Sequence, residues 1–317
     1  MSVGRLVAGG RHDGHQPMSP IRPLTSDLRP LASSPGPPTS DPCAACRLII
    51  DEPVAGSWNM SVDEALLEAA IGGGPATLRL YQWSEPTLSL GYFQRYDDRR
   101  SHAASRDSAV VRRSSGGGAI LHDRELTYSL TLPAGHRLAR NAAALYSVVH
   151  RLFLQVLTLR LATASAGWRL QIVPARQAAA GGSRRPADAE PFLCFQRRSP
   201  GDVLLVPAAG TSATPLGRNQ SHAWKIVGSA QRRRGGAILQ HGSVLLERSP
   251  AAPELPGYSD LADEAISFAA LAEEFTTRFS AELAVDVAAT SLPDTVCDAA
   301  RQIEREKYAN QAWTTRR

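Results

Sequence analysis

Apolar residues recur along the chain at two spacings, which predict strands in some stretches and helices in others. Leu78 and Leu80 alternate with other residues, and Leu88 and Leu90 do the same up to Gly91. This period of two is typical of half-buried β-strands. Short apolar runs predict further strands at 48–50, 110–111, 126–132, 203–206 and 237–246.

Helical spacing appears in four other stretches. Asn59 is expected to cap a helix that carries apolar residues on one face and ends at glycines 72–74. A longer amphipathic stripe runs from an expected Asn141 cap to Val156. Two further helices are predicted at 268–279 and, after Pro293, at 296–303. Because strands and helices do not alternate regularly, the pattern favours an α+β (mixed α/β) fold over a doubly wound one.

The domain organisation follows from where this periodicity begins. Residues 1–46 are rich in Pro, Ser, Gly and Arg, show no period, and are predicted to form a disordered tail. The main domain is expected at 47–250, with 251–317 as a C-terminal helical part of the same domain. Cys43 and Cys46 form a lone C-x-x-C without a second pair, so we expect no metal there.

Composition narrows the class of protein. The chain has 317 residues, of which 43% are hydrophobic, enough for one substantial core. It has no uninterrupted apolar run of roughly 20 residues and no secretory signal, which predicts a cytoplasmic protein. A net charge of +5 favours an anionic partner, either a nucleic acid or an acidic protein. Lys225 and Lys307 are the only lysines in an arginine-rich chain.

The first segment with candidate chemistry runs from Arg112 to Asp123 and reads RRSSGGGAILHD. Three consecutive glycines allow backbone N–H groups to approach a ligand closely. The two arginines before them can pair with a phosphate or a carboxylate in a forked geometry. A tight turn between two strands is the alternative interpretation of the glycine run.

The second segment reads WKIVGSAQRRR over 224–234 and continues through two glycines to LQHGS at 239–243. A rare lysine beside small residues and arginines indicates a site for an anion or a carbonyl group. A basic hairpin with its charges in solvent is the alternative. The arginine run also suits RNA or DNA, although no aromatic residues are interleaved with it.

Together these segments resemble the paired signatures of the lipoate-protein ligase and octanoyltransferase superfamily. Asn59-Met60 with Asp63-Glu64, Leu88–Gly91 with Gln94, and Trp313 extend the resemblance over roughly 48–317. It implies a central mixed, largely antiparallel sheet flanked by helices, like the catalytic domain of biotin-protein ligases. It also implies an acyl pocket whose substrate-binding residues are Arg112, Arg113, Ser115, Gly116, Gly117, Gly118, His122, Gly228, Ser229, Gln231, His241 and Gly242.

The resemblance also implies a nucleophile. A cysteine in Phe192-Leu193-Cys194-Phe195 is ordinarily a small core residue. In the octanoyltransferases that the chain resembles, however, a Cys-Phe pair precedes the lysine segment, as Cys194 precedes Lys225 here. Cys194 and Lys225 are therefore the expected catalytic residues, with no metal and no cofactor. The 207–223 stretch is longer than the corresponding turn in those transferases.

The expected reaction moves an octanoyl group from octanoyl-acyl carrier protein to a lipoyl-domain lysine, with the glycine cleavage H protein or a dehydrogenase E2 subunit as acceptor. His122, His241 and solvent are candidate bases that the sequence does not rank. An ATP-dependent lipoate-protein ligase, with Cys194 structural, and a lipoyl-domain amidotransferase are the enzyme alternatives. The non-enzyme alternative is a nucleic-acid-binding module that uses Arg112, Arg113 and Arg232–Arg234. Neither a membrane nor a nucleic acid is expected as partner of the transferase.

Overall fold

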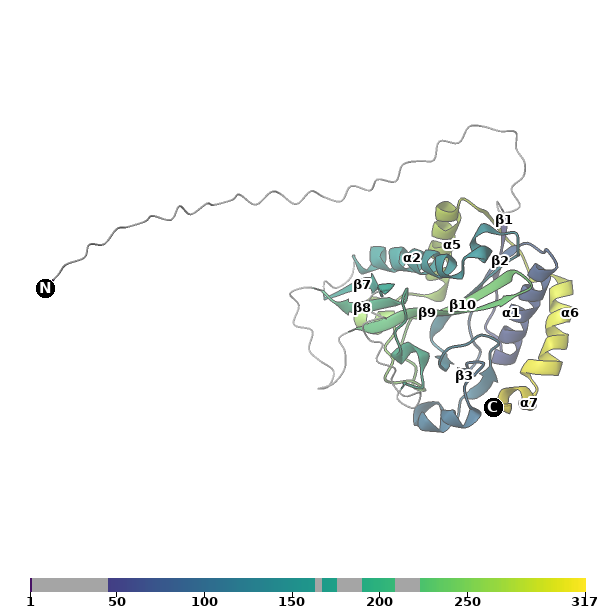
Figure 1. Cartoon of the computed structure of the whole chain (residues 1–317), viewed down its shortest axis with the longest axis horizontal. Coiled ribbons are helices and arrows are strands. Elements are labelled where there is room, and N and C mark those ends of the chain that lie inside the picture. The colour runs from purple at the N-terminus through teal and green to yellow at the C-terminus, as the bar shows by residue number, and fades with distance from the viewer. Residues whose placement is uncertain (2–44, 163–166, 176–189, 209–222) are drawn as a thin grey trace, which may run out of the picture. The chain divides into compact units, whose positions relative to one another are not determined.

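The computed structural model describes residues 1, 45–162, 167–175, 190–208 and 223–317. From Ala45 on, these residues belong to one compact unit with two sheets (Figure 1). The described strands are β1 (Ala45–Ile50), β2 (Ala76–Tyr81), β3 (Thr87–Leu90), β4 (Ala109–Arg112), β5 (Ile120–His122), β6 (Glu125–Leu132), β7 (Trp168–Ile172), β8 (Val203–Pro207), β9 (Trp224–Arg234), β10 (Ala237–Leu245) and β11 (Asp286–Ala289). The described α-helices are α1 (Gly56–Ile71), α2 (Ala142–Leu161), α4 (Tyr258–Ala262), α5 (Phe268–Leu283), α6 (Asp294–Ile303) and α7 (Gln311–Thr315).

The larger sheet has eight described strands in the order β11-β1-β2-β6-β10-β9-β8-β7. β1 pairs in parallel with β2 and β11, whereas the pairs from β2 to β7 are antiparallel. The smaller sheet has the order β4-β3-β5. The predicted mixed, largely antiparallel sheet is therefore confirmed. One difference is that the C-terminal part, expected to be helical, also supplies the edge strand β11.

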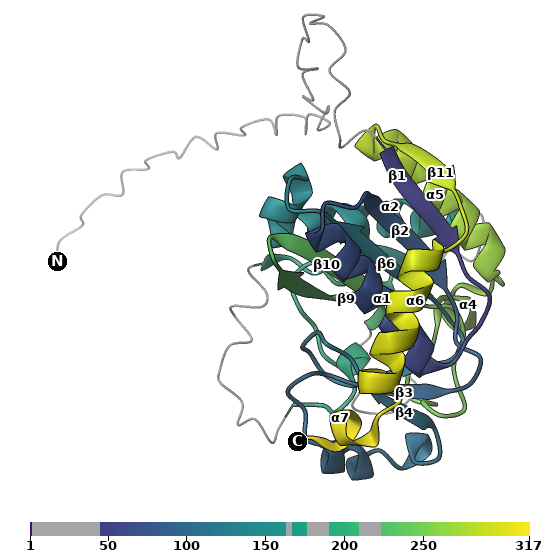
Figure 2. The same cartoon turned by 90° about the vertical axis from the view of Figure 1, so that its right-hand side faces the viewer.

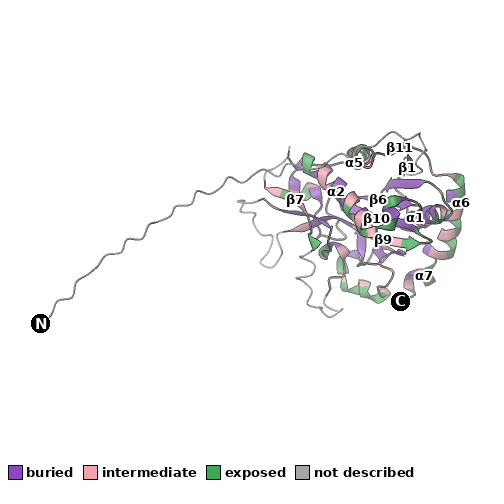
Figure 3. Cartoon of the chain, turned by 45° about the horizontal axis from the view of Figure 1, so that its top comes forward, coloured by how far each residue is buried: buried purple, intermediate pink, exposed green. Residues whose placement is uncertain are grey.

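Helices cover both faces of the larger sheet. α2 and α5 contact each other and lie on one face, whereas α1 and α6 pack together on the other (Figures 1 and 2). The main core lies under α2 and α5 and is built from leucines of β2 and β6 with aromatic residues such as Phe153 and Phe275. Figure 3 shows the inner strands buried and the exposed residues on the outer sides of the helices.

Helix α2 confirms the strongest predicted helix and its cap. The backbone N–H of Ala144 donates to the Asn141 side chain at 3.0 Å, as an N-cap requires. Among the described helices, α2 alone is long and apolar enough to cross a bilayer. Leu145, Val149 and Phe153 of this helix are fully buried in the main core, which accounts for its apolar face.

Asn59 does not cap α1 as expected. The helix begins at Gly56, where a Cβ would lie 2.8 Å from atoms of Thr87 and Trp83. Asn59 lies inside the helix and is completely buried. Its amide donates to the carbonyl oxygens of Val54 and Gln82 at 3.3 and 3.1 Å. Asn59 therefore connects the first turn of the helix to the end of β2 and is not its N-cap.

The boundary of the tail also moves. β1 begins at Ala45, and Cys46 is buried between β2 and β11, where it pairs with Ala76 and Val287. Cys46 is therefore a core residue, although the sequence assigned it to the tail. Cys43 and the rest of the predicted tail lie outside the described residues, as does 209–222 of the predicted insertion.

Candidate active site

Cys194 opens a short 3-10 turn, Cys194–Gln196. Its backbone N–H donates to the carbonyl oxygen of Ala119 at 2.7 Å, and the Ala119 N–H donates to Phe192 at 3.1 Å. These bonds attach the turn to the end of the glycine segment. Leu193 and Phe195 on either side are buried in a second core, which leaves the half-buried Cys194 held between two anchored neighbours.

Lys225 on β9 reaches the cysteine. Its Nζ lies 3.8 Å from Cys194 Sγ and 2.9 Å from the Asp202 carboxylate, and it sits 5.3 Å from the centre of the Phe195 ring. The lysine side chain lies over Gly228, where a Cβ would come within 2.3 Å of Lys225 Cε. The structure thus brings the two expected catalytic residues together. The lysine side chain packs against the backbone of Gly228, which has no side chain in its way.

A register shift in β9 decides which residues face this site. Val203 pairs with Val227 while Leu204 pairs with Lys225, so Ile226 is an extra residue. Lys225 and Gly228 consequently fall on the same face of the strand, and Ala230 follows two residues later. Ser229 and Gln231 point to the opposite face, under α2.

Ser229 and Gln231 belong to a buried hydrogen-bond network on that opposite face. Ser229 Oγ lies 2.6 Å from both Tyr128 Oη and His150 Nε2. The amide of Gln231 donates to Ala142 O at 2.7 Å and to the Gln240 side chain at 2.6 Å. The two side chains therefore connect the sheet to α2, and the substrate-binding role that the resemblance implied for them stays a prediction.

The two arginines of the first segment also support the fold. Arg113 Nη2 donates to the carbonyl oxygens of Gly116 and Gly118 at 2.8 and 2.7 Å. Arg112 donates to Gly91 O at 3.0 Å and to Thr314 O at 2.9 Å. Both side chains are buried, and burial lowers the pKa of Arg113 to about 10, against the pull of a Cys194 thiolate. These arginines shape the glycine segment, and their burial removes them from any nucleic-acid surface.

Backbone conformation explains one of the three glycines in that segment, and close packing explains another. Gly117 adopts a φ of +96°, a left-handed conformation that favours glycine. A Cβ on Gly118 would lie 2.9 Å from the Arg197 guanidinium group and 3.1 Å from Phe192 O. Gly116 is more open, since only Phe93 comes within 4 Å of an added Cβ. Gly116 therefore has open space beside it, and its expected role in substrate binding stays a prediction.

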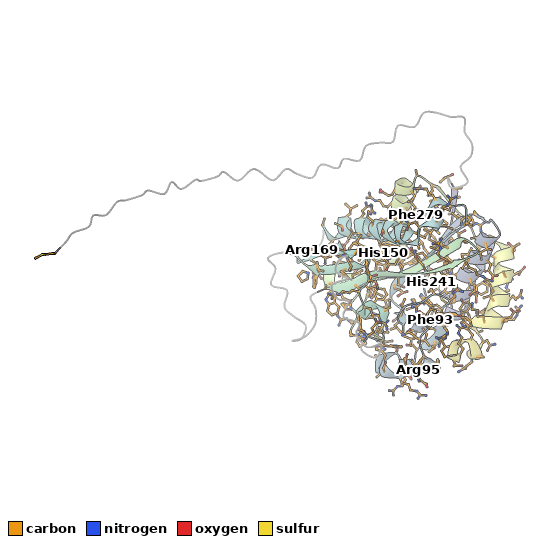
Figure 4. The ribbon with its side chains drawn as sticks, in the orientation of Figure 1. Phe93, Arg95, His150, Arg169, His241 and Phe279 are labelled. Carbon is orange, nitrogen blue, oxygen red and sulfur yellow. The ribbon has the colours of Figure 1, made fainter. Side chains whose placement is uncertain are left out.

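His241, labelled in Figure 4, lies in a chain of hydrogen bonds on the site face. Its Nε2 is 2.6 Å from Ser115 Oγ, and its Nδ1 is 3.1 Å from the Asp63 carboxylate. Burial favours the neutral form of Asp63, but the hydrogen bond from His241 and the charge of Arg79 lower the pKa of Asp63 overall. Next to His241, Gly242 leaves room for Ser229, because a Cβ there would come within 2.2 Å of Ser229 Oγ.

His122 is engaged through both ring nitrogens. Nδ1 lies 2.6 Å from the Glu125 carboxylate, Nε2 lies 2.8 Å from Ser89 Oγ, and the ring stacks on Trp83 at 3.9 Å. His122 and His241 both line a narrow cavity beside Arg113, together with Met60, Tyr81, Ile120, Thr127, Ala230, Gly242 and Ser243. The space open to the centre of a water molecule is about 10 Å³, roughly enough for one water. In this structure the cavity is too small to hold an acyl chain.

Three residues close to Lys225 were missed by sequence reasoning: Asp202, Tyr146 and His150. Asp202 precedes β8, and the other two lie one helical turn apart on α2. Tyr146 and His150 give a weak sequence signal, as polar residues within an otherwise apolar helical stripe, whereas Asp202 gives none. Within the described ranges, no group of three or more His, Cys, Asp or Glu side chains is arranged to hold a metal ion.

Comparisons with known proteins agree with this architecture. A family profile described as the lipoyl protein ligase A/B catalytic domain matches residues 56–169. The octanoyltransferase LipM of Brevibacillus brevis is 27% identical over 296 residues, covering 86% of this chain and 99% of the relative. That of Moorella thermoacetica is 37% identical over 191 residues, covering 59% and 60% of the two chains.

Solved structures resemble the fold at low sequence identity. A putative lipoate protein ligase from T. acidophilum with bound lipoic acid has a TM-score of 0.58 and 19% identity, covering 86% of this chain and 99% of that one. Lipoate-protein ligase A bound with ATP has a TM-score of 0.59 and 19% identity, covering 86% and 98%. The resemblance found in the sequence is confirmed: the chain is similar to octanoyltransferases over most of its length, and it has the fold of lipoate-protein ligases.

Proposed function

We propose that this enzyme transfers an octanoyl group from octanoyl-acyl carrier protein to a lipoyl-domain lysine through a thioester on Cys194. The observation that carries the proposal is the 3.8 Å separation of Lys225 Nζ and Cys194 Sγ. An ammonium group at this distance favours a thiolate by its charge. The similarity to octanoyltransferases over most of the chain supports the choice of acyl group.

Transfer proceeds in two displacements. The Cys194 thiolate adds to the thioester carbonyl of the donor, a new S–C bond forms, and the donor's S–C bond breaks. The carrier sulfur leaves and takes up the proton that Cys194 released. In this mechanism, the Lys225 ammonium stabilises both the thiolate and the developing oxyanion.

In the second displacement, the amine of the acceptor lysine attacks the acyl group on Cys194. An N–C bond forms, the S–C bond breaks, and the proton lost by the amine restores the Cys194 thiol. The acceptor is a lipoyl-type domain, such as the glycine cleavage H protein or a dehydrogenase E2 subunit. The net charge of +5 supports this pairing, because such carriers and acceptors are usually acidic.

The acyl-enzyme itself is the test. Incubation with octanoyl-acyl carrier protein alone should add one octanoyl group to the protein, visible by intact mass, cleaved by hydroxylamine and discharged by an acceptor domain. Cys194→Ser should abolish the thioester, whereas Cys297→Ser on α6 is the matched control and should remain active. An unacylated wild-type protein beside an active Cys194→Ser variant would refute the thioester mechanism.

Two related assays separate the alternative enzymes. Robust ATP–pyrophosphate exchange with lipoate or octanoate would identify an ATP-dependent ligase, in which Cys194 is structural. Acylation from an octanoylated H protein in place of the carrier protein would identify an amidotransferase between lipoyl domains. We expect neither activity to match transfer from the acyl carrier protein.

A further inference from the structure

We infer that Asp202 is a positioning residue that locks the Lys225 ammonium beside Cys194 as a permanent positive charge, so that Lys225 does not accept the proton of the acceptor amine. The inference deepens the proposed function, because it assumes that Cys194 and Lys225 form the reacting pair. It rests on the contacts of the buried Asp202 carboxylate.

That carboxylate is completely enclosed and fully hydrogen bonded. Its side chain is 0% exposed, and that of Lys225 is 3% exposed. Oδ2 accepts from Lys225 Nζ at 2.9 Å and from the Ser199 backbone N–H at 2.7 Å, while Oδ1 accepts from Tyr146 Oη at 2.7 Å. A buried carboxylate requires a cation, and among the described ion pairs Lys225 is its partner.

The neighbouring network supplies no competing cation. Gly201 O can only accept, so His150 Nδ1 carries a proton and donates to it at 2.7 Å. His150 Nε2 lies 2.6 Å from Ser229 Oγ and accepts from it when the ring is neutral. Burial lowers the pKa of His150 to about 4, in agreement with this hydrogen-bond pattern.

The polar groups around the Lys225, Asp202 and Cys194 side chains come from four parts of the chain. Asp202 precedes β8, Cys194 lies on the 3-10 turn, and Tyr146 and His150 lie on α2. Arg113, on the glycine segment, interacts electrostatically with Cys194. The Lys225 ammonium thus lies between one carboxylate at 2.9 Å and one sulfur at 3.8 Å. Loss of its proton would leave Asp202 buried without a cation, so the ion pair opposes deprotonation of the lysine.

The lysine content of the chain makes this testable by direct labelling. Lys225 and Lys307 are the only lysines, so competitive acetylation at a series of pH values, followed by peptide mass spectrometry, reports on each amine separately. Lys307 donates to Glu64 at 2.7 Å, far from this site in the sequence, and serves as the internal control. In the wild type, we expect the labelling midpoint of Lys225 to lie no lower than that of Lys307.

Asp202→Asn removes the charge and keeps the shape. We expect it to lower the labelling midpoint of Lys225 by roughly 1–3 pH units, because an opposite charge at this distance has an effect of that size. The midpoint of Lys307 should not move. Tyr146→Phe is the matched variant, since it removes one hydrogen bond to Asp202 but retains the carboxylate, and it should leave the Lys225 midpoint in place.

The readout is independent of catalysis. A Lys225 midpoint near neutral pH in the wild type would overturn the inference without any variant, even if Asp202→Asn fails to fold. An unmoved Lys225 midpoint in folded Asp202→Asn would also overturn it. Failure of octanoyl-acyl carrier protein to load Cys194 would instead refute the proposed function, and the labelling result would still stand.

In folded Asp202→Asn, the rate of Cys194 acylation should fall at alkaline pH, where the wild type remains active, because the lysine then loses its charge within the assay range. A purely structural role of Asp202 would lower the rate equally at every pH. An acylation rate that rises as Lys225 loses its proton would show that the neutral amine acts as a base, contrary to the inference.

Discussion

Gly228→Ala tests whether Lys225 works from its position over the strand. The new Cβ would lie 2.3 Å from Lys225 Cε and 2.7 Å from Nζ. Carbon atoms pack at about 3.5 Å or more, so the end of the lysine must move by at least about 1 Å. Nζ would then leave its contacts with both Cys194 and Asp202, which stand at 3.8 and 2.9 Å.

The size of the effect follows from this displacement. A misplacement of about 1 Å in a reacting group costs on the order of 100-fold in rate, or about 2.7 kcal/mol in the barrier. Weakening a buried ion pair destabilises the fold by up to about 3 kcal/mol. Alanine offsets about 0.4–1 kcal/mol of this loss by restricting the unfolded chain. We therefore expect the free energy of unfolding to fall by up to about 2 kcal/mol and the acylation rate to fall by about 100-fold.

Single-turnover acylation of Cys194 by octanoyl-acyl carrier protein measures the rate, and urea unfolding measures the stability. Gly135→Ala is the matched control, because nothing lies within 4 Å of a Cβ at that position. It should be silent in both assays. An acylation rate for Gly228→Ala within twofold of the wild type would refute the argument that the lysine must lie over Gly228.

Three further predictions concern residues near the site and in the core. Lys225→Arg should slow acylation by roughly 100-fold in the same assay, because a planar guanidinium group cannot replace the compact ammonium over Gly228. Burial lowers the pKa of His150 from 6.5 to about 4 in the folded protein. Between these two pH values, His150 is protonated in the unfolded chain but neutral in the folded protein. Stability should therefore fall by about 3 kcal/mol as the pH drops through this window, and urea unfolding of His150→Gln should show a smaller fall. Burial raises the pKa of Cys46 to about 11, so iodoacetamide at pH 8 should label this residue only after unfolding, as peptide mapping will show.

Helices and strands with a clear period could be predicted from the sequence, because burial on one face leaves a direct trace in the order of residues. The apolar stripe from Leu145 to Val156 is an example, and the Asn141 cap of the same helix could also be predicted. Asn59 was misplaced because a polar residue before an apolar stripe suits a cap, whereas one of its actual partners, the carbonyl oxygen of Gln82, follows β2 and lies 23 residues away. Local rules carry no information about such partners.

The Cys194–Lys225 pair could be predicted only through the family resemblance. These residues are 31 positions apart and meet because β8 pairs with β9 while the turn at Cys194 is tied to Ala119. Asp202 remained invisible because an acidic residue after Pro200-Gly201 looks like an ordinary solvated turn. Its burial becomes apparent only when α2 covers it with Tyr146.

The second motif also shows why a sequence signature does not assign roles to its individual residues. β9 presents Lys225, Gly228 and Ala230 to the site and Ser229 and Gln231 to α2, because one extra residue at Ile226 resets the alternation. Each face of β9 restricts which residues the strand can carry. On the face of Lys225, the lysine side chain needs the space that Gly228 leaves free. On the face of α2, Ser229 and Gln231 belong to a buried hydrogen-bond network in which each donor requires an acceptor. The network fixes Asp202 and the strand that carries Lys225, so the position of the proposed reacting pair depends on residues on the opposite face of β9.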